Sequence, residues 1–240
     1  MSKPLLIAAP LALFAALAAF AAEPPVTATP PSGPPPVAPI VTPPVTPAAG
    51  PRTFAIDAKK SSVVIQVFKD GAAAALAHDH VVEARDLSGT IVGDGVDATT
   101  AKVEVTAQTA SFINDDTKMR TKYGLDGEIS EKDRKAVEEN MKSKDQLDIK
   151  GFPTVKFSST SVTKAADGKL TLNGKLTLHG VTKDVTMPVD VKMAPDSLSG
   201  TATFRAKTSD YGIKPYSALL GAVKNKDEIV IHLHLVANAK

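Results

Sequence analysis

Apolar and polar side chains alternate along most of the chain beyond residue 52. Val63, Ile65 and Val67 occupy every second position, and the polar Gln66 lies between two of them. Successive side chains of a β-strand point to opposite faces, so this alternation predicts strands that bury one face only. The expected strands cover residues 63–67, 87–92, 102–106, 155–157, 170–178, 185–193, 202–206 and 229–235.

Turn signals separate these strands, and one segment follows a different pattern. Asp94-Gly95, Asp167-Gly168 and residues 198–200 are typical of tight turns. Residues 130–141 are rich in helix-forming side chains and begin with Ser130, a suitable N-cap, which predicts one helix inserted between strands. Pro188 lacks a backbone donor, so its strand is expected at a sheet edge or a bulge.

Strands that bury only one face favour antiparallel pairing. About eight of them can close into a barrel, which leaves no exposed edge strand. The predicted fold class is therefore all-β, an antiparallel β-barrel of about eight strands with one inserted helix. A β-sandwich is the alternative architecture for the same strands.

The first 51 residues have the composition of an export signal followed by a spacer. Residues 1–21 combine Lys3, an apolar stretch and a small-x-small site, as a cleavable signal peptide does; a retained membrane anchor is the alternative. Residues 23–51 hold twelve of the 18 prolines, so we expect residues 22–51 to form an extended, disordered linker. Residues 52–240 are left for one β-barrel domain.

The inward positions of the predicted barrel carry side chains of modest size. An eight-stranded barrel either fills its interior with side chains or holds one small ligand. The chain has no Trp and only three Tyr, and this shortage of bulk favours an apolar hollow. The residues expected to contact a ligand there are Val63, Ile65, Val67, Val105, Phe157, Leu172, Leu176, Met187, Phe204, Ile231 and Leu233.

Composition argues against several classes of function. Lysine and arginine number 28 against 26 acidic residues, with no basic block, so no nucleic-acid partner is expected. The absence of cysteine excludes disulfides and cysteine-linked lipid anchors. The chain has no Gly-x-Ser-x-Gly elbow and no phosphate-binding glycine loop, so an enzyme is not expected. Residues 114–116 (NDD) could form a catalytic or calcium loop, but a solvated turn is the favoured interpretation.

Four segments, in order, carry a resemblance to a known family. Residues 54–57 (FAID), followed by Ser61-Ser62-Val63, resemble the opening of YceI-like domains. Residues 147–160 (LDIKGFPTVKFSST) and 174–185 (GKLTLHGVTKDV) are similar to two internal segments of that family. Residues 209–213 (SDYGI) resemble the segment before its last strand. The four segments together span essentially the whole predicted barrel.

The resemblance to this YceI-like, polyisoprenoid-binding family implies a lipocalin-like barrel. It implies an exported, periplasmic binding protein that sequesters or carries a polyisoprenoid, a quinone or another lipid, with no cofactor beyond such a ligand. A transient membrane contact and a homodimer are compatible with this interpretation. Residues 71–80 depart from the family pattern, and we expect Gly180 to serve a tight turn rather than a ligand.

The histidines support an alternative function. His78 and His80 flank Asp79, while His232 and His234 are two residues apart on the last expected strand. Because barrel closure brings the last strand beside the first, these side chains could bind a transition metal, in a periplasmic metal-binding protein or a metallo-enzyme that uses His78 and His80. The competing interpretation places the later pair on the outer face and treats the earlier pair as part of a polar loop.

Overall fold

The computed structural model describes residues 50–125 and 127–240. The expected signal peptide, residues 1–21, and almost all of the expected linker, residues 22–51, lie outside the described residues. None of the helices in the described part of the chain has the length and apolar character needed to cross a membrane.

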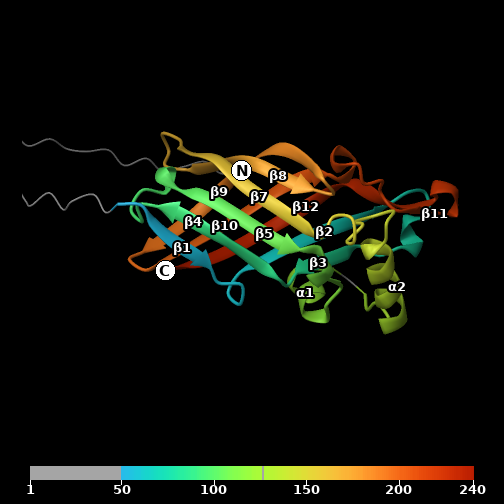
Figure 1. Ribbon diagram of the computed structural model, residues 1–240. Coiled ribbons are helices and arrows are strands. Elements are labelled where there is room, and N and C mark those ends of the chain that lie inside the picture. The colour runs from blue at the N-terminus through green and yellow to red at the C-terminus, as the bar shows by residue number, and fades with distance from the viewer. Residues whose placement is uncertain (1–49, 126) are drawn as a thin grey trace, which may run out of the picture. The chain divides into compact units, whose positions relative to one another are not determined.

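Twelve strands and two α-helices make up the described part of the chain (Figure 1). The strands are β1 (Arg52–Ile56), β2 (Ser62–Asp70), β3 (His80–Ala84), β4 (Leu87–Gly93), β5 (Lys102–Gln108), β6 (Phe112–Asn114), β7 (Thr154–Lys164), β8 (Leu170–Leu178), β9 (Val181–Ala194), β10 (Ser197–Lys207), β11 (Ser217–Ala218) and β12 (Val223–Ala239). The helices are α1 (Thr117–Lys122) and α2 (Glu131–Lys142). All eight expected strands are present, and the alternation missed the short strands β1, β3, β6 and β11.

Eight strands form a closed antiparallel ring. The order is β1-β4-β5-β7-β8-β9-β10-β12, and β12 pairs again with β1. This closure confirms the predicted barrel and rejects the sandwich, because a sandwich would leave two separate sheets with free edges.

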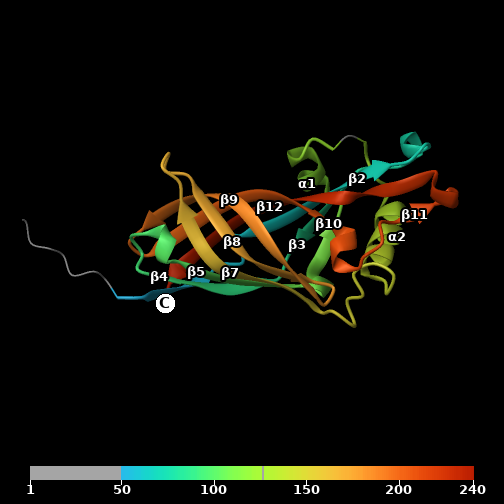
Figure 2. The ribbon, with the colours of Figure 1, turned by 90° about the horizontal axis from the view of Figure 1, so that it is seen from above.

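A second set of strands extends the wall at one end of the barrel. β12 pairs with β1 from Ala237 to Ala239, and with β2 over Lys224 to His234. β2 pairs in turn with β3, and β3 with β6. Both ribbon views place α2 and β11 at this end (Figures 1 and 2).

Helix α2 agrees with the helix predicted over residues 130–141. Its N-cap Ser130 accepts a hydrogen bond from the amide of Asp133 (3.1 Å), and the acidic Glu131 and Asp133 lie in the first turn, where the helix dipole favours negative charge. The helix packs against β6. Its Met141 packs against the buried side chains around Phe112.

Helix α1 was not predicted. The side chain of Asp116 caps it by accepting hydrogen bonds from the amides of Lys118 and Met119. The ring of Tyr123, just after the helix, lies 4.9 Å from the ring of His232 on the outer face of β12. Helix α1 packs against β3, and Val64 and Val81 are buried although both side chains point away from the barrel interior.

The connection between β8 and β9 is a two-residue hairpin turn. His179 and Gly180 have φ values of 49° and 74°, as a turn with two left-handed residues requires. The ring of Phe152 packs over this turn, so closely that a Cβ built at Gly180 would lie 2.5 Å from the ring. Gly180 is thus placed in the tight turn that the sequence predicted.

Pro188 lies where one side of its strand loses a partner. β9 pairs with β8 over Val181 to Val189, but with β10 only from Val189 to Ala194. The expected edge position is therefore confirmed. A short 3-10 helix, Thr208–Tyr211, packs beside this open edge, and Tyr211 is buried there.

The main hydrophobic core occupies the barrel interior. Its buried members come mostly from β8, β9, β10 and β12, among them Leu172, Met187, Phe204 and Ile231. A second cluster, centred on Phe112, lies at the end that carries α2. A third, centred on Phe54, closes the opposite end.

Candidate binding cavity

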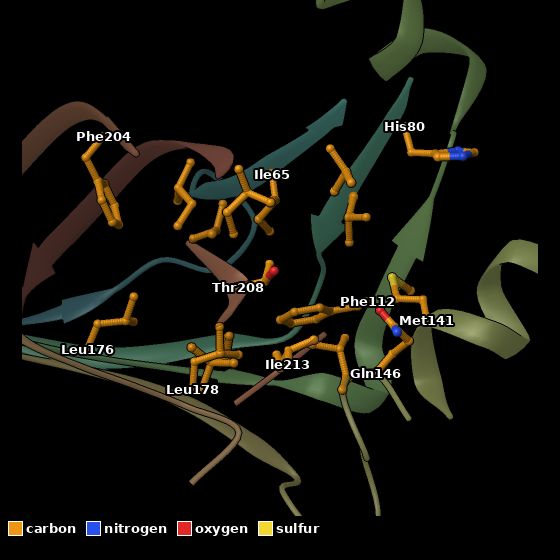
Figure 3. A pocket seen from close by; sticks show the side chains of 18 of the residues that line it. Ile65, His80, Phe112, Met141, Gln146, Leu176, Leu178, Phe204, Thr208 and Ile213 are labelled. Atoms are coloured by element: carbon orange, nitrogen blue, oxygen red, sulfur yellow. The ribbon is translucent and has the colours of Figure 1, made fainter. Parts of the chain in front are cut away.

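The barrel encloses a cavity of about 460 Å³. Figure 3 shows side chains from several strands converging on it, with Phe204 and Leu176 at one end and Met141 and Gln146 at the other. Sites that bind small molecules generally have volumes of about 300–1,000 Å³. The hollow predicted from the sequence therefore exists, and its size suits a ligand.

Strand alternation determines which side chains line the cavity. All eleven residues predicted to face a ligand lie on its wall: Val63, Ile65, Val67, Val105, Phe157, Leu172, Leu176, Met187, Phe204, Ile231 and Leu233. These side chains point inward because the inward face of each strand is set by its period of two. Contact between these residues and a ligand stays a prediction.

One glycine helps to keep the interior open. Strand β8 pairs with β7, so Gly174 lies close to Phe157 on the neighbouring strand. A Cβ built at Gly174 would lie 2.5 Å from the Phe157 ring. Because position 174 has no side chain, the Phe157 ring lies against the barrel wall above it. The aromatic ring therefore lines the cavity instead of crossing it.

The mouth of the cavity lies between α2 and the hairpin formed by β11 and β12. Four residues line the cavity and are also exposed to solvent: Ala136, Asn140, Tyr216 and Lys226. The first two belong to α2, and the other two flank the hairpin. A ligand could enter here, because these four lining residues are also exposed to solvent.

Polar lining residues are concentrated on the helix, loops and strand ends rather than on the barrel strands. They are His80, Asn140, Gln146, Thr208, Tyr216, Asn225 and Lys226. The remaining lining residues are almost all aliphatic or aromatic. An apolar interior with a polar mouth fits an amphiphile that has a hydrocarbon chain and a polar end.

Sequence reasoning missed the residues that line the mouth. Ala136, Val137 and Met141 come from α2, while Gln146 and Leu147 follow it. The only available signal was the apolar stripe on a helix that is otherwise strongly charged. A helical stripe does not identify the element that it faces, so it could not place α2 over the barrel.

A second, smaller cavity of about 90 Å³ lies at the other end of the barrel interior. Val191, Met193 and Leu198 help to line it, and it shares Leu172 and Leu233 with the main cavity. The interior side chains of the main core therefore divide the hollow into a large chamber near α2 and a small one near β1.

A buried cluster of charges adjoins the main cavity at His80. The Nδ1 atom of His80 lies 2.7 Å from one carboxylate oxygen of Asp115, and Nη1 of Arg120 donates to the other at 2.9 Å. The Asn114 amide and the backbone amide of Val81 donate two further hydrogen bonds to this carboxylate. The side chain of Asp115 is fully buried.

The environment of Asp115 favours its charged form. Burial by itself would raise the pKa of this carboxyl group, but the hydrogen bond and charge of His80, with the bonds from Asn114 and Val81, lower the pKa below the usual 3.8. The interpretation of residues 114–116 as a solvated turn is wrong for Asn114 and Asp115, which are buried. Their partners are distant in sequence, so composition could not reveal them.

The metal hypothesis finds no support in the described part of the chain. Among residues 50–125 and 127–240, no three His, Asp or Glu side chains are grouped so that they could hold a metal ion. His80 is engaged by Asp115, and His78 is exposed in the loop before β3. The Asp79 carboxylate accepts a hydrogen bond from the amide of Lys69 (2.8 Å).

The last-strand histidines lie on the outer face, as the competing interpretation expected. His234 is exposed. Nε2 of His232 donates to the Gln66 side chain (2.7 Å), and its Nδ1 accepts from the Thr203 hydroxyl (3.1 Å). Burial lowers the pKa of His232, and the nearby Lys122 lowers it further. These contacts use both ring nitrogens of a neutral imidazole.

Comparison with known proteins places the whole barrel in one sequence family. Residues 54–237 match the family model described as a YceI-like domain. A UPF0312 protein of Shewanella baltica strain OS185 is 31% identical over 148 residues, which cover 58% of this chain and 67% of the relative. A UPF0312 protein of Pseudomonas fluorescens strain SBW25 is 32% identical over 136 residues, or 54% of this chain and 62% of the relative.

Solved structures share the fold at lower sequence identity. BcnA of Burkholderia cenocepacia matches with a TM-score of 0.57 and 22% identity, over 76% of this chain and 99% of that one. A polyisoprenoid-binding domain from Saccharophagus degradans matches with a TM-score of 0.52 and 12% identity, over 78% of this chain and 98% of that one. Both likenesses concern the fold.

Proposed function

The chain belongs to the family of YceI-like domains, and from this premise we propose that it is a non-catalytic binding protein for an elongated apolar molecule. The ligand class we propose is a polyisoprenoid, a quinone or another lipid with a hydrocarbon chain. The cavity of about 460 Å³ is the observation that carries this proposal. The Saccharophagus degradans domain, which is described as polyisoprenoid-binding, supports the choice of ligand class.

The lining of the cavity provides the physical reason for binding. Each CH₂ group that leaves water for an apolar site contributes about 0.8 kcal/mol. The strands supply the apolar wall, and the polar side chains at the mouth, such as Gln146 and Asn225, can solvate the polar end of a ligand. Affinity then depends mainly on chain length and little on a particular headgroup contact.

Two measurements test this function. Organic extraction of the purified protein, followed by mass spectrometry, should identify a long-chain apolar molecule. Binding of a homologous series of n-alkyl alcohols should tighten about fourfold per CH₂ group until the cavity is full, and then level off. An affinity that does not change with chain length, together with an extract free of lipid, would contradict the proposal.

We propose export to the periplasm as the setting of this function. The support is the signal-like sequence of residues 1–21 and the proline-rich stretch that follows it. Mass spectrometry of the protein from its native cells should find a mature N-terminus close to Ala22. A chain that retains Met1 or Ser2 and fractionates with the cytoplasm would contradict export.

A further inference from the structure

Three large leucines project into solvent beside the cavity mouth. Leu76, Leu219 and Leu220 expose 76%, 67% and 109% of their reference surface. Leu76 ends a 3-10 helix between β2 and β3, and the other two form the tip of the hairpin between β11 and β12. We call these three residues the apolar tip.

The two segments of the apolar tip are joined by the backbone. The amide of Ala73 donates a hydrogen bond to the carbonyl of Ala222 (2.7 Å). A Cβ at Gly71 would lie 2.5 Å from the same carbonyl oxygen, so the two loops are in close contact. Both ribbon views show them together at the end of the domain beyond α2 (Figures 1 and 2).

The leucines of the hairpin bury little surface within the fold. Leu219 and Leu220 have φ values of 49° and 55°, a left-handed conformation that Gly and Asn adopt at lower cost. Their side chains make no buried contact, since both are exposed. A strained backbone that displays two bulky apolar side chains to solvent indicates a contact with something outside the chain.

The charges around the apolar tip are mainly positive. Residues 69–79 and 214–226 contain four lysines and two aspartates, and both aspartates lie in the first segment. Asp70 is 3.4 Å from Lys224. Among the described residues, Lys214 and Lys226 form no ion pair with a carboxylate, and Nζ of Lys226 lies 5.9 Å from the centre of the Phe68 ring. Neither ammonium is neutralised by a direct ion pair, so both add to the positive charge that an anionic partner would meet.

The apolar tip is continuous with the entrance to the cavity. Tyr216 and Lys226 flank the hairpin that carries Leu219 and Leu220, and both line the cavity mouth. A surface that covered the apolar tip would therefore also face the mouth. A ligand with a long hydrocarbon chain resides in a bilayer rather than in water.

We propose that the apolar tip docks on the surface of a lipid bilayer that carries anionic headgroups. The leucines enter the interface between headgroups and acyl chains, and the surrounding lysines contact the headgroups. The cavity mouth then opens toward the membrane. The choice of a bilayer as the partner rests in part on the proposed ligand class, but the docking is measured without any ligand.

Vesicle flotation tests the docking directly. The probes are vesicles of phosphatidylcholine with about one third phosphatidylglycerol, and vesicles of phosphatidylcholine alone. The mature protein, which we propose begins close to Ala22, should float with the mixed vesicles, less with the neutral ones, and less as salt increases. The double substitution Leu219→Asn/Leu220→Asn should weaken binding by at least about tenfold, since Asn tolerates the left-handed backbone but has no apolar side chain.

Val96 provides a matched control. It is 74% exposed in the turn between β4 and β5, at the opposite end of the barrel. Val96→Asn should bind vesicles as the unaltered protein does. Because the chain has no cysteine, Leu220→Cys and Val96→Cys can each carry an environment-sensitive dye. The fluorescence emission of the dye at position 220 should shift to shorter wavelength when mixed vesicles are added. The emission of the dye at position 96 should not shift.

Three results would overturn the docking proposal. The unaltered protein could fail to float with mixed vesicles, or the double variant could float equally well. The apolar tip could instead mediate self-association. Gel filtration would then show an oligomer of the unaltered protein and a monomer of the double variant, and neither protein would bind vesicles. Binding of n-alkyl alcohols in solution should be unchanged in the double variant, so a failure of docking is distinct from a failure of the proposed function.

Discussion

Asp115 is a charged carboxylate that the fold holds away from water. Its two oxygens face His80 and Arg120, and Arg120 also donates to the backbone carbonyl of Asp79 (2.7 Å). The network links the start of β3 to α1, two segments that sequence analysis did not connect. Removing one partner of a buried ion pair is costly because the other charge stays desolvated.

Replacing Asp115 by Asn should therefore lower the free energy of unfolding by about 3 kcal/mol at neutral pH. Chemical denaturation monitored by circular dichroism measures this value. The control is Asp184→Asn, which removes an exposed ion pair with Lys175 (2.8 Å) and should change stability by less than about 1 kcal/mol. Equal effects of the two substitutions would show that the buried cluster does not stabilise the fold.

The same carboxylate makes stability depend on pH in a defined direction. The pKa of Asp115 is lowered in the folded state, so its stabilising contribution is present above the ordinary value of 3.8 and is lost as the pH falls through the folded-state pKa. The unaltered protein should thus lose more stability below about pH 4 than Asp115→Asn does. This difference separates the ionic role of Asp115 from a role in packing alone.

At the scale of elements, the hairpin between β8 and β9 requires glycine at position 180, both for its backbone conformation and for the space beside it. Gly180 has a φ of 74°, and the Phe152 ring lies where a Cβ would project. The neighbouring His179 ring is 4.3 Å from the Phe152 ring, and its Nδ1 donates to the carbonyl of Tyr211 (3.3 Å). The turn is therefore packed against the loop before β7 and the 3-10 helix after β10.

Gly180→Ala should destabilise the protein by about 2–4 kcal/mol, because the left-handed backbone costs about 1–2 kcal/mol and the Phe152 ring must also move. Gly168→Ala is the matched control. Gly168 has a φ of 84°, but nothing lies within 4 Å of its Cβ position, so only the backbone cost of about 1–2 kcal/mol applies. Thermal denaturation of both variants that gave the same loss would exclude the Phe152 contact as a factor.

An element could be predicted from the sequence where its signal lies within the element's own residues. The period-two pattern revealed the eight longer strands, and the N-cap and charged first turn revealed α2. Helix α1 has six residues, too few for a periodic signal, and β6 has three. The inward wall of the cavity was predicted for the same reason as the strands. The mouth and the Asp115 cluster were not, because they depend on contacts between segments far apart in sequence.

At the scale of the whole domain, one part of the barrel interior is packed and stabilises the fold, while another part stays open as a cavity. The cluster around Leu172, Met187 and Ile231 stabilises the barrel, while the chamber near α2 stays open. Protein interiors are normally packed without such voids, and each void weakens the fold. The open chamber therefore supports the proposal that the barrel receives a ligand there.

Partly filling the chamber should weaken binding without unfolding the protein. Val67 on β2 lines the main cavity and none of the smaller one, so the larger side chain of Val67→Phe can extend into open space. Stability should change by less than about 1.5 kcal/mol. Binding of long n-alkyl alcohols should weaken at least about tenfold, because several CH₂ groups lose their place in the cavity.

The matched substitution is Val191→Phe, which adds the same side chain to the small cavity of about 90 Å³ at the far end. That space is too small for a long chain, so alcohol binding should be retained while stability falls through overpacking. Titration calorimetry and thermal denaturation of both variants give the two readouts. If Val67→Phe bound long alcohols as tightly as the unaltered protein, the chamber near α2 would not be the binding site. The apolar wall of the barrel would then need another explanation.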